Sequence, residues 1–403
     1  MISLLVTFIT SAHAAPVVFF DDLQNFKSKN LNLQTEHLRL EASSDFLLSK
    51  KLFWTPRIDV SLQKTQTRLN SEEITNSDSI NADLNLNLFR GGSDWNLYKD
   101  AKAQNNAQEL QVLNESLRVE IKASDLIFKS LYLIESKRIE EQLLKLKEES
   151  LKIVTDRYRQ GKLPLQEVTK SEVDLIQQKN KLRSANLDYI ENKSQISSLF
   201  INEIKTSAWP FDESSRTALP ESSNLPLIEQ QYWLGQSRHE AWKAARGEYF
   251  PSLDLQIQHQ ESPVKNRKDK QWTGLLVLSF PLWSGLETYS KVSSAYADYV
   301  GALNTYKDTE QSLREKNKFL KQKIEIVRLN LSESKKNLET SKKLYQDILR
   351  SFRLGRISTN DLILEQNRLL ESENALALSQ LNFHQSLIET CALAGLKSSD
   401  CVQ

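Results

Sequence analysis

The sequence contains the same succession of features twice, at a nearly constant offset. A basic, aromatic segment with one glycine at its fifth position, R-Y-R-Q-G-K-L-P from Arg157, occurs again as S-F-R-L-G-R-I-S from Ser351. The segments P-R-I-D-V-S-L-Q and P-S-L-D-L-Q-I-Q, which begin at Pro56 and Pro251, precede these corners in the same order. Features that recur in one order at nearly constant spacing indicate a duplication. The chain therefore has to fold as two copies of one unit.

The boundaries of the two copies follow from composition. We expect a first repeat at 15–208 and a second repeat at 227–403, joined by a proline- and serine-rich connector at 209–226. Residues 1–14 are apolar and end in an A-x-A signature, which predicts an export signal. The segment lacks Lys and Arg, which a misplaced start codon would explain; the alternative is an ordinary amino-terminal helix or strand.

Each repeat is expected to contain two strands, at about 57–67 and 79–89 in the first copy and about 251–260 and 272–282 in the second. Apolar and polar residues alternate in these segments, which predicts one apolar and one polar face. A half-buried sheet in a soluble domain has the same pattern. The segment length, the Asn, Asp and Gln of the polar face and the export signal favour a membrane barrel instead. Because four strands cannot close a barrel, this interpretation requires several chains.

Long helical hairpins follow the strands, at about 93–206 with a tip at 157–164, and at about 286–396 with a tip at 350–358. Neither proline nor glycine occurs between positions 93 and 159. About 65 helical residues would reach about 100 Å. In the helix after the first tip, apolar residues recur every seven positions from Val168, which indicates coiled-coil packing along a narrow seam.

Composition excludes several classes of function. The 53 basic and 52 acidic side chains are balanced, which argues against a nucleic-acid partner. The histidines are scattered, and no nucleophile, carboxylate pair or phosphate-binding glycine loop accompanies them, so we expect no catalytic, cofactor-binding or metal-binding residues and no enzyme. The spacing of Cys391 and Cys401 does not decide whether they pair.

The ordered set of motifs resembles the TolC-type family of outer-membrane efflux proteins. Its carriers are A-R-G-E-Y-F-P-S-L from Ala245 before a strand, L-F-R-G-G from Leu88 after a strand, and the two glycine corners. The resemblance implies a homotrimer in the lipid of the outer membrane. It also implies a twelve-stranded barrel continued by a periplasmic tunnel of helices, which docks to a periplasmic adaptor and an inner-membrane pump.

The resemblance also assigns roles to the corners. In the family the corners form the closed periplasmic tip, and acidic residues just beyond the second corner ring the entrance. The docking surface would then comprise Arg157, Tyr158, Arg159, Gly161, Lys162, Phe352, Arg353, Gly355 and Arg356. The candidate gate residues are Asp361 and Glu365, although Asp361 is equally suited to a helix amino terminus. The corners themselves are expected to be glycine-capped helix ends.

The predicted fold is therefore mainly α with a β-barrel part, built from a duplicated unit of helix, β-hairpin and long helical hairpin. The predicted function is the outer-membrane exit channel of a tripartite efflux or type I secretion system, with a long periplasmic extension. One alternative is a periplasmic coiled-coil adaptor or structural protein. Another is a coiled-coil enzyme subunit, which no sequence motif supports. The exported cargo is not specified by the sequence.

Overall fold

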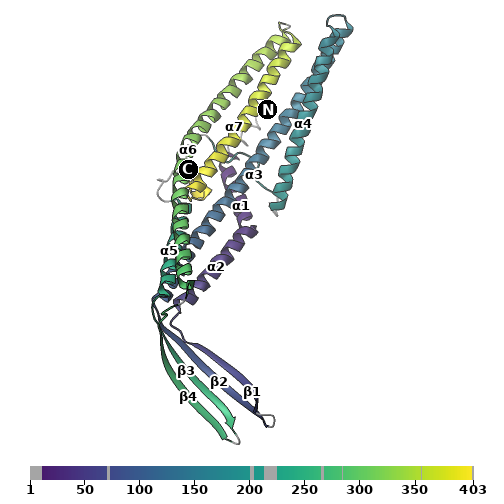
Figure 1. Cartoon of the computed structure of the whole chain (residues 1–403). Coiled ribbons are helices and arrows are strands. Elements are labelled where there is room, and N and C mark those ends of the chain that lie inside the picture. The colour runs from purple at the N-terminus through teal and green to yellow at the C-terminus, as the bar shows by residue number, and fades with distance from the viewer. Residues whose placement is uncertain are drawn as a thin grey trace. The chain divides into compact units, whose positions relative to one another are not determined.

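The structure is a computed structural model of the 403-residue chain. It describes residues 11–69, 73–199, 204–212, 225–264, 267–283, 285–354 and 356–401. Most of the predicted export signal and most of the predicted connector fall outside these ranges. The chain divides into two compact units, which are described separately: unit 1 comprises Met1–Thr35, Leu113–Pro226 and Leu313–Gln403, and unit 2 comprises Glu36–Val112 and Leu227–Ser312 (Figure 1).

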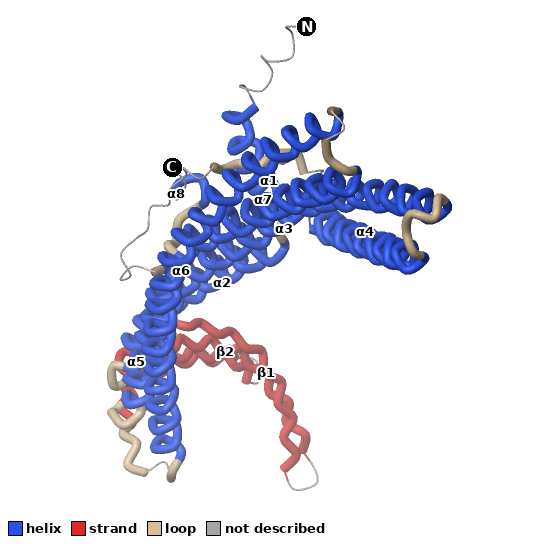
Figure 2. The backbone as a smooth tube through the Cα atoms, turned by 90° about the horizontal axis from the view of Figure 1, so that it is seen from above, coloured by secondary structure: helices blue, strands red, loops and turns tan. Residues whose placement is uncertain are grey.

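Unit 2 contains one curved antiparallel sheet with the strand order β1-β2-β3-β4 (Figure 2). Its strands are β1 (Arg57–Leu69), β2 (Glu73–Arg90), β3 (Ser252–Val264) and β4 (Arg267–Ser279). The two hairpins come from the two repeats, and the pairing of β2 with β3 joins them into a single sheet.

The strands extend further toward their turns than the alternation of the sequence indicated. Pairing continues to Leu69 opposite Glu73 in the first hairpin and to Val264 opposite Arg267 in the second. The ladder is held by backbone hydrogen bonds, which do not require apolar side chains. Polar segments that the sequence suggested were loops therefore continue as strand.

The register places like side chains on like faces across β1, β2 and β3, whereas on β4 the apolar Leu275 and Val277 lie opposite Gln256 and Asp254 of the polar face. Ile58 lies opposite Leu84, which lies opposite Ile257 on its other side. The register shifts between Asn87 and Phe89, where β2 carries one residue more than β3. This β-bulge brings Phe89 opposite Leu253 and hence onto the apolar face, although strict alternation would have assigned it to the polar face.

Two helix pairs complete unit 2. The helix α2 (Leu31–Lys51) accompanies the first part of α3 (Ser93–Arg159), and the Ser44 hydroxyl lies 3.1 Å from the Asn105 side-chain oxygen between them. The helix α5 (Pro226–Gly247) accompanies the first part of α6 (Glu287–Arg353). There the contact is aromatic, with Trp242 stacked on Tyr299 at 6.1 Å. The first repeat thus joins its helix pair through polar side chains, whereas the second repeat uses stacked aromatic rings.

A close backbone approach connects the end of β2 with the end of α5. Gly91 has a positive φ of 58°, and a Cβ atom at this position would lie 2.3 Å from the carbonyl oxygen of Gly247. The neighbouring Gly92 also has a positive φ, of 78°, but a Cβ atom there would meet nothing within 4 Å. The two glycines therefore share a backbone constraint, and only Gly91 has a packing constraint in addition.

We expect Gly91→Ala to destabilise the protein much more than Gly92→Ala. Both substitutions place a Cβ in the left-handed region, which costs about 1–2 kcal/mol. Only Gly91→Ala also forces a steric overlap, which adds about 1–3 kcal/mol. Thermal unfolding of the purified variants would measure the difference, with Gly92→Ala as the matched control. Equal melting temperatures would contradict the close approach.

Unit 1 contains the remainder of both long helices, each followed by a shorter one. The helices α3 and α6 have 67 residues each, and α4 (Leu165–Leu199) and α7 (Thr359–Leu393) have 35 residues each. Equal lengths in both copies follow from the duplicated sequence. Because α4 is about half as long as α3, it accompanies only the part of α3 in unit 1. None of the described helices carries an apolar stretch long enough to cross a membrane.

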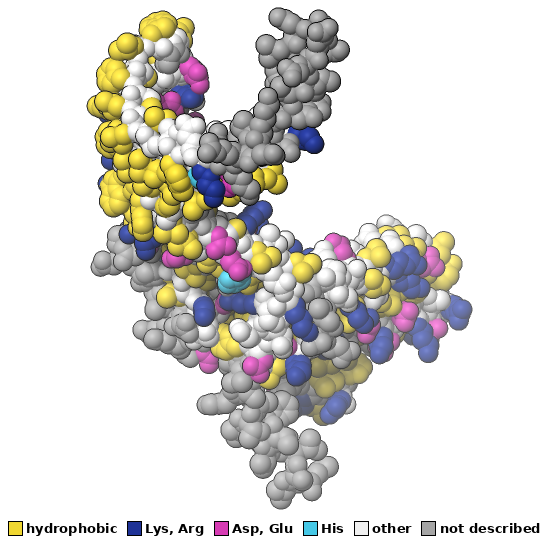
Figure 3. Space-filling model, turned by 90° about the horizontal axis from the view of Figure 1, so that it is seen from below, with side chains coloured by type: hydrophobic (Ala, Val, Ile, Leu, Met, Phe, Trp, Pro, Cys, Tyr) yellow, Lys and Arg dark blue, Asp and Glu magenta, His cyan; other side chains and the backbone are white. Residues whose placement is uncertain are grey.

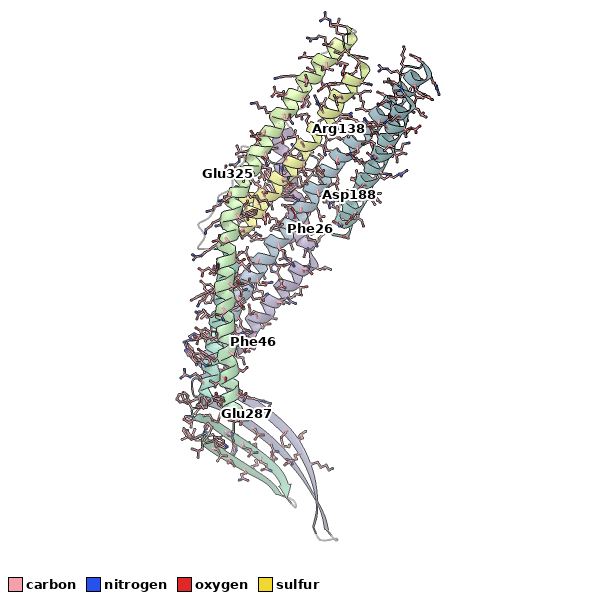
Figure 4. The ribbon with its side chains drawn as sticks, turned by 45° about the horizontal axis from the view of Figure 1, so that its top comes forward. Phe26, Phe46, Arg138, Asp188, Glu287 and Glu325 are labelled. Atoms are coloured by element: carbon pink, nitrogen blue, oxygen red, sulfur yellow. The ribbon has the colours of Figure 1, made fainter. Side chains whose placement is uncertain are left out.

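The two repeats meet in unit 1 where α3 packs against α7. The Arg138 guanidinium donates to Glu373 at 2.6 Å and to Glu135 at the same distance (Figure 4). Beside this ion pair, Leu370 packs with Ile139 and Leu146 in a buried apolar cluster. The order of these contacts makes α3 and α7 antiparallel, so both corners lie at the same end of unit 1.

The short helices at the chain ends are fastened to α3. The helix α1 (Ser11–Lys29) stacks Phe19 on Phe128 at 5.1 Å. The Glu120 carboxylate pairs with Lys27 and also accepts a hydrogen bond of 2.7 Å from the backbone N–H of Ser398, at the start of α8 (Ser398–Cys401). The Glu120 side chain is buried, so these charge-assisted contacts hold both ends of the chain. At the end of α7, Cys391 is buried and disulfide-bonded.

A buried histidine holds the described start of the connector. His384 on α7 donates from Nδ1 to the carbonyl oxygen of Gln380 at 2.7 Å, and its Nε2 accepts from the backbone N–H of Phe211 at 3.2 Å. Both ring nitrogens are thus satisfied in the neutral form. Burial lowers the pKa of His384 to about 4.

We expect the protein to lose stability between pH 6.5 and pH 4 because of this residue. The unfolded chain takes up a proton near pH 6.5, whereas the folded chain resists it down to about pH 4. The contribution, about 3 kcal/mol in order of magnitude, is complete above pH 6.5 and disappears as the pH falls through the folded pKa. His384→Gln, which does not titrate, should show a smaller decrease in melting temperature over the same interval. An identical decrease in both proteins would contradict this assignment.

Candidate functional site

The first corner connects α3 to α4. At the end of α3 the N–H of Gly161 donates to the Tyr158 carbonyl at 2.8 Å, and the N–H of Lys162 donates to the Arg157 carbonyl at 2.9 Å. Gly161 has a φ of 70°. A left-handed glycine with these two bonds terminates the helix and satisfies its last carbonyls. The expectation of a glycine-capped helix end is met at this corner.

The second corner connects α6 to α7 and repeats the same bond. The N–H of Arg356 donates to the Ser351 carbonyl at 3.0 Å, five residues back as in the first corner. Gly355 itself lies outside the described residues. Because the flanking bonds correspond, the two corners are structural equivalents.

The corners present a positively charged and partly apolar surface. Arg159, Lys162, Arg353 and Arg356 are exposed, and Tyr158 is 41 % exposed. Arg157 and Phe352 are half-buried. Exposed Leu354 adds an apolar side chain that the sequence interpretation did not include. The described residues of the predicted docking set therefore lie at one end of unit 1.

Asp361 is engaged in a capping box at the start of α7. Its carboxylate accepts from the Ser358 hydroxyl at 2.7 Å and from the Ser358 backbone N–H at 3.1 Å, while its own N–H donates to the Ser358 hydroxyl at 3.2 Å. Hydrogen bonds from the Ser358 side chain and then its backbone lower the pKa of the Asp361 carboxyl. The residue is exposed and remains ionised, so capping and a role in a charged entrance are compatible.

Glu365 lies one turn further along α7. Its carboxylate accepts from Arg368 at 2.6 Å, and its side chain is only 12 % exposed. Its charge is thus compensated within the same helix. Of the two gate candidates, Asp361 presents the more accessible negative charge.

The capping box has no counterpart in the first repeat, where Pro164 stands at the position of Ser358. We expect Ser358→Ala to raise the rate of amide hydrogen exchange in the first turn of α7 roughly fivefold, the typical effect of losing a cap. The first turn of α4 serves as an internal control and should not change. Unchanged exchange in α7 would contradict the capping role.

The sheet of unit 2 exposes a continuous apolar face. Hydrophobic side chains gather on its convex side (Figure 3). The most exposed members are Ile58 (66 %), Val60 (70 %), Leu62 (80 %), Trp272 (72 %), Leu276 (66 %) and Leu278 (71 %), and the exposed Leu282 (86 %) and Trp283 (83 %) follow the end of β4. A soluble protein does not leave an apolar face of this extent in water.

Aromatic residues stand near both ends of this face. Trp272 lies toward the hairpin turn of β4, and Phe280 and Trp283 follow its other end. Eight residues separate Trp272 from Phe280, about 27 Å along a strand. This agrees with the apolar band of a tilted membrane strand, flanked by aromatic residues at the two interfaces.

The opposite, concave face carries amide and carboxylate side chains. Asp59 lies opposite Asp83, and Asn85 opposite Gln256. Asn81 is buried, and its side-chain oxygen has no hydrogen-bond partner in the described part of the protein. Polar groups of this kind require water, which a wet lumen on the concave side would supply.

Sequence reasoning missed several residues that organise this architecture. One is Asp22, whose carboxylate accepts hydrogen bonds from the backbone N–H groups of Lys205 and Thr206. Another is His384. Neither residue stands in a sequence motif that would indicate its role. Ser358 could have been found, because S-x-x-D before an apolar run is a capping signal. The bulge at Leu88 could not, since it appears only when β2 is aligned with β3.

Comparison with known proteins agrees with this geometry. Residues 23–200 match the family described as "Outer membrane efflux protein". The fold is similar to the CmeC outer membrane channel of Campylobacter jejuni (15 % identity, 95 % of this chain and 88 % of that chain, TM-score 0.81). It is also similar to VceC of Vibrio cholerae (11 %, 94 % and 96 %, 0.77) and to the open state of MtrE of Neisseria gonorrhoeae (15 %, 94 % and 89 %, 0.78). The curated proteins contain no significant sequence match.

A sheet with an exposed apolar face, joined to long helical hairpins, defines the class of outer-membrane channel proteins. The family match over residues 23–200 and the fold confirm the resemblance to TolC-type outer-membrane efflux proteins that was found in the sequence. Both support a place in the outer membrane, with a helical periplasmic part.

Proposed function

We propose that three copies of this chain form the exit channel of a tripartite efflux or type I secretion system. The observation that supports this most directly is the four-stranded sheet with an exposed apolar convex face and a polar concave face. Four strands are too few to enclose a lumen, and about eight are the practical minimum. Three copies supply twelve strands, which enclose a water-filled channel.

The channel is passive in this proposal. The concave asparagines, aspartates and glutamines face water and suit a hydrated path. No phosphate-binding loop is present in the sequence, so the energy for transport comes from an inner-membrane pump. The cargo is then selected by that pump.

The two corners form the periplasmic entrance and the adaptor-docking surface. Their location at one end of unit 1 supports this assignment, because a trimer would then bring six such corners into one rim. The cations at this rim, Arg159, Lys162, Arg353 and Arg356, suit an acidic or carbonyl-rich adaptor surface. Asp361 adds a negative charge to the same rim and is our first candidate for a gate residue. Glu365, one turn further along α7, is the second candidate.

The alternative of a soluble periplasmic adaptor or structural protein accounts for the helical hairpins but not for the sheet. Side chains such as Leu62 and Trp283 would stay in water, although burying each in lipid would contribute about 1.5–3 kcal/mol. The exposed apolar face therefore favours the channel.

Cell fractionation and native mass measurement test the proposal. We expect the protein in the outer-membrane fraction as a trimer that dissociates on heating. A monomer released with the soluble periplasmic contents would overturn it and support the alternative.

The gate role of Asp361 can be separated from its capping role by two variants. Asp361→Asn removes the charge, whereas Ser358→Ala removes the capping contact and keeps the charge. In a planar bilayer we expect Asp361→Asn to change the single-channel conductance or cation selectivity at least twofold and Ser358→Ala to change them little. Equal effects of the two variants on conductance and selectivity would contradict the gate role and leave Asp361 only its role in capping α7.

A further inference from the structure

Unit 1 contains a cavity of about 850 Å³ that the proposed channel does not use. Its walls come from both repeats, since α3 belongs to the first repeat and α6 and α7 belong to the second. The segment 204–209, which leads into the connector, forms the remaining side. None of the described lining residues belongs to the two corners. Pockets that bind small organic molecules have volumes of about 300–1,000 Å³, so this cavity has the size of a ligand site.

The floor of the cavity is apolar. It is formed by Ile127 and Leu131 on α3, Leu338 on α6 and Ala377 on α7, and all four side chains are buried. Ala377 and the neighbouring wall residue Ser130 have short side chains, which leave space that larger residues would fill in a close-packed interior. A floor of this kind takes up the apolar part of a ligand, because binding removes apolar surface from water on both sides.

The mouth of the cavity is open to solvent. Ser207 and Lys342 are exposed, and Ile134 is 51 % exposed although its side chain is large and apolar. Trp209 also lines the cavity, and its ring lies 4.8 Å from the ring of the buried His384, which holds it in place. A ligand can therefore enter from solvent, and a tryptophan in the wall reports its arrival.

Four charged side chains line the cavity, namely Glu135, Arg138, Glu373 and Lys342. The first three are engaged with one another, because the Arg138 guanidinium donates to both carboxylates at 2.6 Å (Figure 4). The ammonium group of Lys342 pairs with no carboxylate among the described residues. A cationic ligand would have to compete with Arg138 for the carboxylates. An anionic ligand meets in Lys342 a cation without a competing partner, with which it can form a charge-assisted hydrogen bond.

The cavity is not a by-product of the duplication. With the two corners aligned, the counterpart of Ile127 on α6 is Lys321, and the counterpart of Ala377 on α4 is Arg183. Both counterparts are long and charged where the cavity has an apolar floor. The combination of an apolar floor and an unpaired cation thus belongs to one pairing of helices and not to the repeated unit.

We propose that this cavity binds an amphipathic organic anion, of which a medium-chain fatty acid is the simplest example. Its apolar chain lies on the floor beside Ile127 and Leu338, and its carboxylate pairs with Lys342 at the mouth. The bound molecule contacts both repeats at once and stabilises their packing, since a ligand that binds only the folded chain shifts the unfolding equilibrium. The site lies within a single chain, so the inference goes beyond the proposed channel and does not depend on its trimer.

Quenching of Trp209 fluorescence tests the site. The probe is bromododecanoate with the bromine at the end of its chain, because bromine quenches a tryptophan that it contacts. We expect saturable quenching of the full-length protein in a nonionic amphipol, and we expect Trp209→Phe to remove the saturable part. Quenching of the tryptophans in the sheet is common to both proteins and is subtracted. Identical quenching curves for the two proteins would overturn the proposal.

Two adjacent lysines separate recognition in the cavity from general surface charge. Lys342→Gln should weaken the binding of bromododecanoate about tenfold, the typical effect of losing one charge-assisted hydrogen bond. The matched control is Lys343→Gln, because Lys343 is exposed on the same helix but pairs with Glu339 at 2.7 Å and does not line the cavity. Its dissociation constant should change less than twofold. Equal weakening in both variants would overturn the role of Lys342.

Competition tests the sign of the ligand's charge. Unbrominated dodecanoate should restore the fluorescence of Trp209, whereas dodecyltrimethylammonium, with the same chain and a positive charge, should restore much less at the same concentration. An equal or stronger effect of the cationic amphiphile would overturn the anionic class. Failure of the proposed function is a separate result, because a chain absent from the outer membrane that still binds dodecanoate as expected would overturn the channel and support the site.

Discussion

The pairing of β2 with β3 turns the two hairpins of the chain into one sheet with two chemically different faces. It joins hairpins from two repeats, which the helices α3, α4 and α5 separate along the chain, into one sheet. Without it each repeat would contribute only a two-stranded ribbon, which is marginally stable in water. With it, one face becomes mainly apolar and the other is polar across β1, β2 and β3, so the sheet suits lipid on one side and water on the other.

The same sheet is incomplete by itself, and this incompleteness is the physical reason for the trimer that we propose. Its edge strands keep unsatisfied backbone groups, which cost several kcal/mol each inside a membrane. The helices have an equivalent deficit, since α4 keeps exposed apolar side chains where α7 buries its own. In the sheet, β1 of the first repeat and β4 of the second each have one neighbouring strand among the described residues, whereas β2 and β3 have two.

Much of the fold could be predicted from the sequence because it follows from local rules. The absence of proline and glycine between positions 93 and 159 predicted α3, which begins at Ser93 and ends at Arg159. Gly161 predicted the helix end, and the structure gives it the expected left-handed conformation. The candidate site was harder to predict, because Asp361 is hydrogen-bonded to Ser358 and Glu365 forms an ion pair with Arg368. Those contacts depend on side-chain geometry that residue type and spacing do not specify.

The duplication, the types of element and the two-faced character of the strands can be read from the sequence alone, because periodicity and helix-breaking residues act over a few positions. The bulge that turns Phe89 onto the apolar face, the burial of His384 against the connector and the approach of Gly91 to Gly247 became visible only in the folded chain. Each of these joins segments that lie far apart in the chain. Their effect depends on distances of a few ångströms, which are set by how the two copies pack together and not by any local pattern.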